Sequence, residues 1–362
     1  MAAVTLASLL SCAPELNVQL LLLVLQSFWW WWFIQWSPKA IIAPFIKSKP
    51  WAKQWTQLNR KGIKEGMFVE FPNDEEAFDF SCGFIAILIQ HFVGGLFCLP
   101  SVLGGRHAFV CAMARHGALC EAGWELQDIV SRAWQVCQGC PSDKAKNPTP
   151  WLVLLAIHHV MGQAMIVPMN IYYHDNGDYH EFVFLLQFAA FLSMMLTNYG
   201  YTLNVETASG LKTMRMTVAT SWLIVCYSRV VRYYIVGTRL SRRFYLDGRI
   251  MLFYIGSASL LLMSLVNLLI FVDSTRKLVK FVLKTSATAE EVVDAAVEVN
   301  SALLRAHSGP LVRSSQKNWA KLRSVVLLGA MSPTSKSKSS PISASGDEHP
   351  AHAESLRQRS CQ

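Results

Sequence analysis

Two adjacent histidines, His158 and His159, lie inside an apolar stretch of the chain between residues 151 and 173. About 20 apolar residues cross the hydrocarbon core of a bilayer as a helix. An ionisable group at that depth is costly and therefore indicates a functional site. A buried imidazole can serve as general base or general acid. We predict His158 and His159 as the catalytic residues of any enzyme activity. The alternative is that they fix helix packing through hydrogen bonds.

Acidic side chains precede the histidines at helical spacing. Glu121, Glu125 and Asp128 follow one another at i, i+4 and i+7, which places them on one face of a helix. Arg229 lies within a later apolar segment, deeper than Arg232. Charged residues in a membrane bundle normally pair with one another, so we expect the acidic face to meet these arginines. Glu121, Asp128 and Arg229 are predicted to bind substrate, with a structural ion-pair lock as the alternative.

The sequence predicts no metal site and no bound cofactor. The histidine clusters typical of integral-membrane di-iron enzymes are absent, as is HExxH. Cys137 and Cys140 form a lone CxxC without a second ligand pair. No Walker A motif, dinucleotide fingerprint, GxSxG elbow or kinase motif set is present, which argues against nucleotide-dependent chemistry.

Composition indicates an all-α, polytopic membrane protein. Of the 362 residues, 52% are hydrophobic and only 16% are charged, against about 25% charged in soluble domains. About seven transmembrane helices are predicted. Their ranges are 16–36, 80–103, 106–122, 151–173, 181–201, 214–236 and 250–272.

The predicted organisation follows from where the basic residues lie. We expect an N-terminal membrane anchor at 1–37, a basic cytosolic loop at 38–79 with a short amphipathic helix on the membrane surface at 49–62, and a transmembrane domain at 80–275. Cytosolic amphipathic helices at 276–330 and a disordered tail at 331–362 complete the chain. The net charge of +9 suits the positive-inside rule and anionic lipid, and no nucleic-acid partner is expected. An arginine-rich loop at 238–249 disagrees with this orientation, because seven spans place it outside.

Four features in order resemble the TLC (TRAM–LAG1–CLN8) domain family, over roughly residues 80–275. They are the stretch GWELQD at 123–128, the histidine pair, a span at 181–198 that ends in Thr-Asn, and Arg229 among apolar and aromatic residues. The resemblance implies a ring of six helices around a lipid-accessible cavity, with the histidine pair facing inward. The first span then lies outside the domain.

The resemblance is closer to the non-synthase TLC-domain proteins than to ceramide synthases. In the synthases the motif continues HHxxT and paired aspartates follow. Here Val160, Met161 and Gly162 follow the histidines, and the next span contains no Asp pair. The resemblance implies a role in membrane lipid homeostasis or lipid binding, with membrane lipids as partners. We expect the endoplasmic reticulum as location, with another endomembrane or the plasma membrane as alternatives. The alternative functions are an acyltransferase that uses acyl-CoA as co-substrate, and a transporter or receptor.

Overall fold

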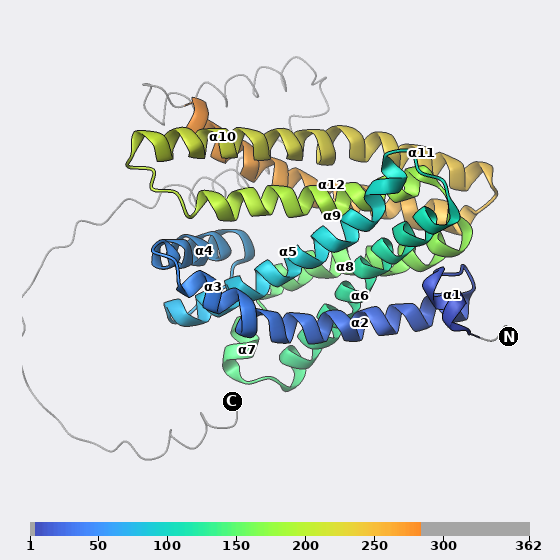
Figure 1. Cartoon of the computed structure of the whole chain (residues 1–362), viewed down its shortest axis with the longest axis horizontal. Helices are drawn as coiled ribbons and strands as arrows, with labels where there is room; N and C mark the ends of the chain where they lie inside the picture. The colour runs from blue at the N-terminus through green and yellow to red at the C-terminus, as the bar shows by residue number, and fades with distance from the viewer. Residues whose placement is uncertain (1–3, 284–362) are drawn as a thin grey trace, which may run out of the picture. The chain divides into compact units, whose positions relative to one another are not determined.

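We analysed a computed structural model, which describes residues 4–283. This part of the chain consists of helices and their connections (Figure 1). The predicted tail at 331–362, and the predicted amphipathic helices beyond residue 283, lie outside the described residues. The elements are α1 (Leu6–Leu10), α2 (Leu16–Ser37), η1 (Pro38–Ile42), α3 (Ala43–Lys47), α4 (Ala52–Met67), α5 (Asp74–Val102), α6 (Ala108–Gln138), α7 (Pro141–Ala145), α8 (Thr149–Tyr172), α9 (Gly177–Gly200), α10 (Ala208–Val225), η2 (Cys226–Arg232), α11 (Tyr233–Leu246), α12 (Ile250–Leu278) and η3 (Val279–Leu283).

Five helical segments of the described chain are long and apolar enough to cross a membrane. They are Leu16–Lys47, Asp74–Val102, Thr149–Tyr172, Gly177–Gly200 and Ile250–Val282. This confirms the prediction of an all-α, multi-pass membrane protein. Two further long helical segments, α6 and the continuous α10–η2–α11, carry more charged residues and are not among these five.

Several predicted boundaries differ from the observed ones for local physical reasons. The second predicted span begins earlier, because the side chain of Asn73 caps α5 by accepting a hydrogen bond from the Glu76 backbone at 2.9 Å. The weak span at 106–122 and the amphipathic stretch after it form one helix, α6, of 31 residues. Pro168 lies within α8, which continues without a break to Tyr172.

Hydrogen bonds tie the loops of the bundle together at its two ends. At one end, Arg115 donates to the carbonyl oxygens of Ser11, Cys12 and His174 at 2.7–2.9 Å. This joins the N-terminal segment to the loop between α8 and α9. At the same end Gly248 takes a positive φ of 68° in the short turn from α11 to α12, where a side chain would be strained.

The opposite end carries the predicted surface helix, which the structure shows as α4. Gln54 of α4 donates to the carbonyl oxygens of Tyr201 and Leu203, after α9, at 3.1 and 2.9 Å. Near the end of α12, the carbonyl of Phe281 accepts a hydrogen bond from Arg215 of α10 at 2.9 Å. These contacts place the connection after α9 beside α4 and the last described turn beside α10.

Helix contacts form a closed circuit. Taken in order, α6 packs on α5, α5 on α9, α9 on α10 and α11, these on α12, α12 on α8, and α8 back on α6. The first long helix, α2, packs on α6 and α5 from outside that circuit. Small residues permit close approach: a Cβ at Gly123 would lie 2.6 Å from the Cβ of Gln26, on α2.

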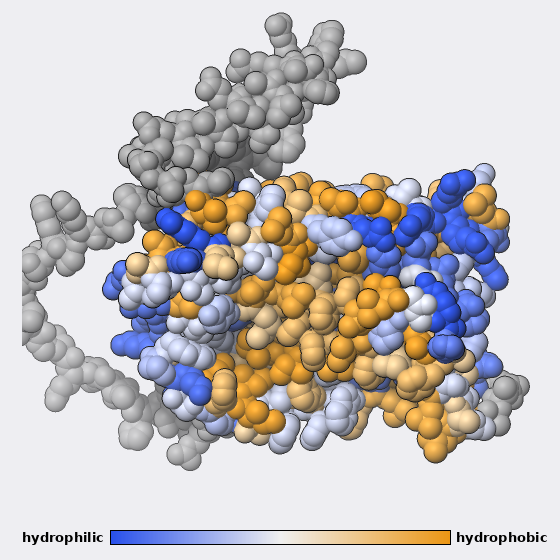
Figure 2. All heavy atoms as spheres, turned by 45° about the horizontal axis from the view of Figure 1, so that its top comes forward, coloured by the Kyte–Doolittle hydropathy of each residue, from blue (hydrophilic) through white to orange (hydrophobic). Residues whose placement is uncertain are grey.

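The surface matches a protein that lies in a bilayer. Figure 2 shows a broad hydrophobic area across the middle of one face, with hydrophilic residues gathered toward both ends. Large apolar side chains on the five long apolar segments are exposed, among them Phe28, Trp29, Leu261 and Leu265. Such a continuous apolar exterior is costly in water and favourable in lipid.

Candidate functional site

Three carboxylates lie together inside the helix circuit. Glu121, Glu125 and Asp128 of α6 are all buried, with exposed fractions of 7%, 1% and 8%. Their i, i+4, i+7 spacing places them on one helix face, as predicted, and this face meets α8 and α5. Buried carboxylates need partners, because an unpaired charge away from water is strongly unfavourable.

Asp128 is the centre of a chain of polar contacts between α6, α8 and the loop after α7. Its Oδ2 lies 2.9 Å from Nε2 of His159 and accepts a hydrogen bond from Arg132 Nε at 2.7 Å. Arg132 also donates to Oδ1 of Asn147 at 2.8 Å. The carboxylate therefore fixes the ring of His159, which is 1% exposed.

His158 faces Glu121 and Glu125, the other two carboxylates of the cluster. Nε2 of His158 lies 3.8 Å from Glu121 Oε1 and 3.9 Å from Glu125 Oε1. Nδ1 of His158 lies 3.5 Å from the sulfur of Met263 on α12. Nδ1 of His159 lies 3.9 Å from Glu125 Oε1 and has no hydrogen-bond partner among the described residues. Both histidines thus contact the carboxylate cluster, although adjacent side chains diverge on a helix.

Polar groups of α5 complete the cluster on the far side of Glu121. Gln90 donates to Glu121 Oε2 at 3.2 Å, and Nδ1 of His91 lies 3.4 Å from the same oxygen. Gln90 in turn lies beside Gln187 of α9. These residues are buried, so Glu121 is enclosed by hydrogen-bonding groups from two other helices.

Trp124 and Gly162 shape the cluster without contributing a charge. The indole ring of Trp124 stands edge-on between the rings of His91 and His159, at centroid distances of 5.2 and 5.0 Å. Gly162 leaves room for Glu125, because a Cβ at this position would overlap both carboxylate oxygens. Gln163 then donates to Glu125 Oε2 at 3.2 Å.

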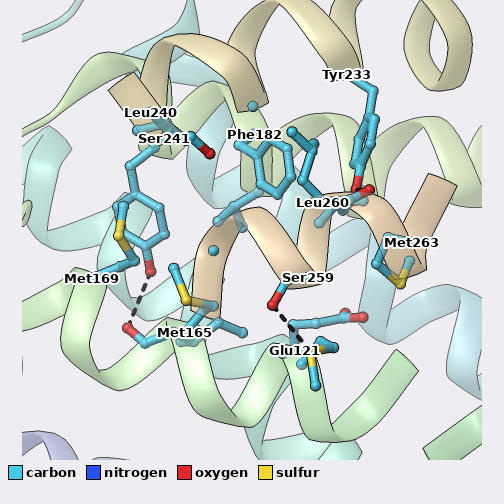
Figure 3. A pocket seen from close by; sticks show the side chains of 18 of the residues that line it. Glu121, Met165, Met169, Phe182, Tyr233, Leu240, Ser241, Ser259, Leu260 and Met263 are labelled. Atoms are coloured by element: carbon cyan, nitrogen blue, oxygen red, sulfur yellow. Dashed lines mark hydrogen bonds between the residues drawn. The ribbon is translucent and has the colours of Figure 1, made fainter. Parts of the chain in front are cut away.

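A cavity of about 110 Å³ opens beside the cluster (Figure 3). Glu121, Glu125 and His158 line one end of it. The remaining wall is mainly apolar and comes from α8, α9, α11 and α12, as the labelled side chains in Figure 3 show. Its apolar members include Met165, Met169, Phe182, Leu240, Phe244 and Leu260. A volume of this size exceeds several-fold the space that one water needs, which is about 15 Å³.

The arginines do not meet the acidic face as expected. Arg232 forms a double hydrogen bond with Glu181 of α9, at 2.7 Å for each nitrogen. Arg229 is buried and donates to the carbonyl oxygen of Leu186 at 2.6 Å. Within residues 4–283 no carboxylate lies in salt-bridge distance of Arg229, although it interacts electrostatically with Glu121. Both arginines belong to η2, a π-helical segment that interrupts the regular helix.

The structure brings together four of the five predicted site residues. His158 and Glu121 line the cavity, whereas His159 and Asp128 lie directly behind them. Arg229 stands apart in η2, where it donates to the carbonyl oxygen of Leu186. The cluster also contains residues that we did not predict for the site: Glu125, Gln90, His91, Trp124 and Gln163. The helical spacing from Glu121 would have indicated Glu125, but nothing in the sequence relates His91 to His159.

The arrangement has two chemical capacities. The imidazoles and carboxylates can accept or donate protons at the polar end of an apolar cavity. Glu125, His158 and His159 also place one ligand atom each within 4.8 Å of one another, a spacing that can hold a metal ion. Comparison with protein-family models, with curated proteins and with solved structures finds no match to this chain. Function therefore has to be inferred from the fold and from this geometry.

Proposed function

We propose that this chain is a TLC-domain membrane protein that binds a membrane lipid in the cavity and contributes to membrane lipid homeostasis. The observation that carries the proposal is the cavity itself, whose polar end is formed by Glu121, Glu125 and His158 and whose remaining wall is apolar. A ligand that fits such a site has one polar head and one apolar chain. Membrane lipids have that form and reach the site from the bilayer.

The dimensions of the cavity suit an acyl chain. Its lining residues on α8 extend from His158 to Met169, along which a helix rises about 16 Å. On α11 they extend from Tyr233 to Phe244, over the same length. The lipid chain lies along these helices, and the head contacts the carboxylates. Methionines at positions 161, 165, 169 and 263 form an adaptable surface for a flexible chain.

Two of the four features that resemble a TLC domain, the GWELQD stretch and the histidine pair, meet at one site, which supports the family proposal. Trp124 and Asp128 of the GWELQD stretch contact His159. Gly123 packs against α2. The closed circuit of α5, α6, α8, α9, α10–α11 and α12 corresponds to the six-helix ring of the family, with α2 outside it.

We propose seven membrane spans, in which α6 and α10–η2–α11 join the five apolar segments. Their charges face the bundle interior or pair with neighbours, as Glu121 and Arg232 do, and such residues are tolerated in a membrane. The test is accessibility to a membrane-impermeant thiol reagent in sealed vesicles, with single cysteines at Ser48 and Ser209 on one expected side and at Asp247 on the other. Labelling of Asp247→Cys from the same side as Ser48→Cys would contradict the seven-span topology.

Lipid occupancy is tested by filling the cavity. Ser259 lines the cavity on α12, whereas Leu261 of the same helix is 70% exposed to the exterior. The full chain is purified in detergent, and bound lipid is quantified by native mass spectrometry. We expect Ser259→Phe to lose the bound lipid and Leu261→Phe to retain it. Equal lipid occupancy in both variants and the wild type would overturn the proposal.

A second candidate function is favoured by the exposure of His158 to the cavity. As an acyl-CoA-dependent acyltransferase, the protein would use His158 to take a proton from an amine or hydroxyl. That nucleophile attacks the thioester carbonyl, the carbon–sulfur bond breaks, and coenzyme A leaves as thiol. Free coenzyme A is measured in membranes that carry wild-type protein, His158→Ala or the exposed control His107→Ala. Release that depends on His158 supports this function, and equal release in all three excludes it.

The endoplasmic reticulum is the proposed location, which rests on the resemblance to lipid-handling TLC-domain proteins. Fluorescence microscopy of the full chain, tagged at its C-terminus and compared with organelle markers, tests this location. A signal confined to the plasma membrane would favour the transporter or receptor alternative instead.

A further inference from the structure

We propose that Glu125, His158 and His159 bind one divalent transition-metal ion of the zinc type, with a coordination position left open toward the cavity. The ligand atoms are Oε1 of Glu125, Nε2 of His158 and Nδ1 of His159. This proposal goes beyond lipid binding and does not rest on it, since an apolar cavity can hold a lipid with or without a metal at its polar end.

The distances between the ligand atoms suit a single ion. Oε1 of Glu125 lies 3.9 Å from each of the two histidine nitrogens. Zinc–nitrogen and zinc–oxygen bonds measure about 2.0–2.2 Å, so two ligand atoms of one ion lie at most about 4.2 Å apart. Both pairs with Glu125 fall within that limit, and the ligand atoms of the three residues all lie within 4.8 Å of one another. A small inward movement of the three side chains gives tetrahedral angles.

The hydrogen bond at Nε2 of His159 orients the ring so that Nδ1 can bind a metal ion. The ionised Asp128 carboxylate can only accept, so Nε2 of His159 donates to it at 2.9 Å, and in the neutral tautomer that this bond selects the lone pair lies on Nδ1. That Nδ1 is fully buried, faces Glu125 and has no hydrogen-bond partner in the described chain. A carboxylate that orients a histidine in this way is the usual support of a metal ligand. Arg132 holds the carboxylate in turn.

The negative charge of the cluster also favours a bound cation. Glu121, Glu125 and Asp128 are buried, and Arg132 balances Asp128 alone. Among the described residues, the salt-bridge partners of Glu121 and Glu125 are histidines. Two carboxylates in a low-dielectric interior require two positive charges to offset the cost of their burial. One divalent ion supplies them.

The remaining position of the ion faces the ligand. Glu125 and His158 line the cavity, and so does Glu121, whose Oε1 lies 3.8 Å from His158 Nε2. A metal site with three protein ligands and an open fourth position holds a water or a substrate oxygen. Glu121 stands where it can accept a proton from that water. Bound metal would occupy the lone pair of His158, so metal binding and the acyltransferase base role of His158 exclude each other.

Metal binding is tested on the full chain, purified in detergent through a tag without histidine, stripped with a chelator and titrated with Co²⁺. We expect one Co²⁺ per chain, with the strong visible absorption of tetrahedral cobalt, displaced by Zn²⁺. Glu125→Gln preserves the shape of the side chain and its contact with Gln163, and should weaken binding at least about 100-fold. Asp128→Asn, which keeps the size of the side chain but alters the support of His159 and the pair with Arg132, should weaken it about 10- to 100-fold.

Two control variants distinguish metal binding at this site from metal binding by histidine or cysteine side chains elsewhere in the chain. His107→Ala removes an exposed histidine at the start of α6, and the double variant Cys137→Ser, Cys140→Ser removes a cysteine pair of which Cys137 is exposed and Cys140 half-buried. Both should bind Co²⁺ like the wild type. Zn²⁺ should also raise the unfolding temperature of the wild type and leave that of Glu125→Gln unchanged. Absence of stoichiometric Co²⁺ binding to the wild type, or binding unaffected by Glu125→Gln, overturns the proposal, whether or not lipid is bound.

Discussion

His159 and Asp128 meet across two helices, with Nε2 of the imidazole 2.9 Å from Oδ2 of the carboxylate, although 31 positions separate them in the chain. The same oxygen binds Arg132. Removing one partner of a buried charged pair leaves the others unpaired. Asp128→Ala should therefore lower the free energy of unfolding by about 3 kcal/mol. The control Asp273→Ala breaks an exposed pair with Lys277 and should cost less than about 1 kcal/mol. Thermal denaturation in detergent measures both, and equal losses would contradict a structural role of Asp128.

Gly162→Ala tests how closely α8 and α6 approach at Glu125. The new Cβ would overlap the Glu125 carboxylate, and overpacking of this kind costs about 1–3 kcal/mol. Gly83→Ala, in α5, is the matched control, because a Cβ there meets nothing within 4 Å. That variant should be neutral or more stable by up to about 1 kcal/mol, owing to helix propensity. Comparable effects of the two substitutions on unfolding temperature would show that the contact at Gly162 is not tight.

The pair of Arg232 and Glu181 should contribute measurably to the packing of η2 on α9. Its geometry is bidentate and both side chains are largely buried, with exposed fractions of 26% and 18%. A double-mutant cycle with Arg232→Met and Glu181→Gln should give a coupling of about 0.5–3 kcal/mol. The exposed pair Lys61 and Glu65, 3.9 Å apart, should give almost none. A coupling at the Arg232 pair as small as that of the exposed pair would contradict the prediction.

Alkaline pH should destabilise the protein through Tyr173, which lies just after α8. Burial, together with the hydrogen bond to Asp247 and the charge of that carboxylate, raises the pKa of Tyr173 from 10.0 to about 12. The folded state thus retains the phenolic proton more strongly than the unfolded state does. The stabilisation is complete below pH 10 and is lost as the pH rises toward 12.

Tyr173→Phe should therefore unfold with a weaker dependence on pH across this range, and should lose about 1 kcal/mol near neutrality with its hydrogen bond. The neighbouring variant Tyr172→Phe is the control, since Tyr172 is exposed and contacts Arg249 through its ring. Unfolding temperatures of the two variants and the wild type are compared over the same pH series. An identical pH dependence of Tyr173→Phe and the wild type would show that Tyr173 does not titrate on unfolding.

The local properties of this protein could be predicted from its sequence. Uninterrupted apolar segments indicated membrane helices, because the length and composition of a segment determine the free-energy cost of exposing it to water. The spacing of Glu121, Glu125 and Asp128 placed them on one face, because the helix repeat is fixed. The amphipathic pattern near residues 49–62 indicated the helix observed as α4. The adjacent histidines drew attention to the cluster, because ionisable groups are rare inside apolar helices.

The contacts between helices could be predicted much less well. We expected the acidic face to meet Arg229 and Arg232. Instead, Arg232 pairs with Glu181, and Arg229 donates a hydrogen bond to a backbone carbonyl. Which charges pair depends on the rotation and depth of each helix. Those follow from packing at small residues such as Gly117, where a Cβ would collide with α5. The π-helical segment η2, which changes the direction of Arg229, also has no clear signal in the sequence.

The sequence by itself determined that the protein is helical and that it belongs in a membrane, and it predicted a functional site near His158 and His159. Only the tertiary structure decided what surrounds those histidines. It divides their roles, since Asp128 holds His159 while His158 faces the cavity. It also adds Glu125 and His91 to the cluster. The physical reason is that apolar periodicity fixes which face of a helix is buried, whereas side-chain volumes at the contacts fix which buried groups meet.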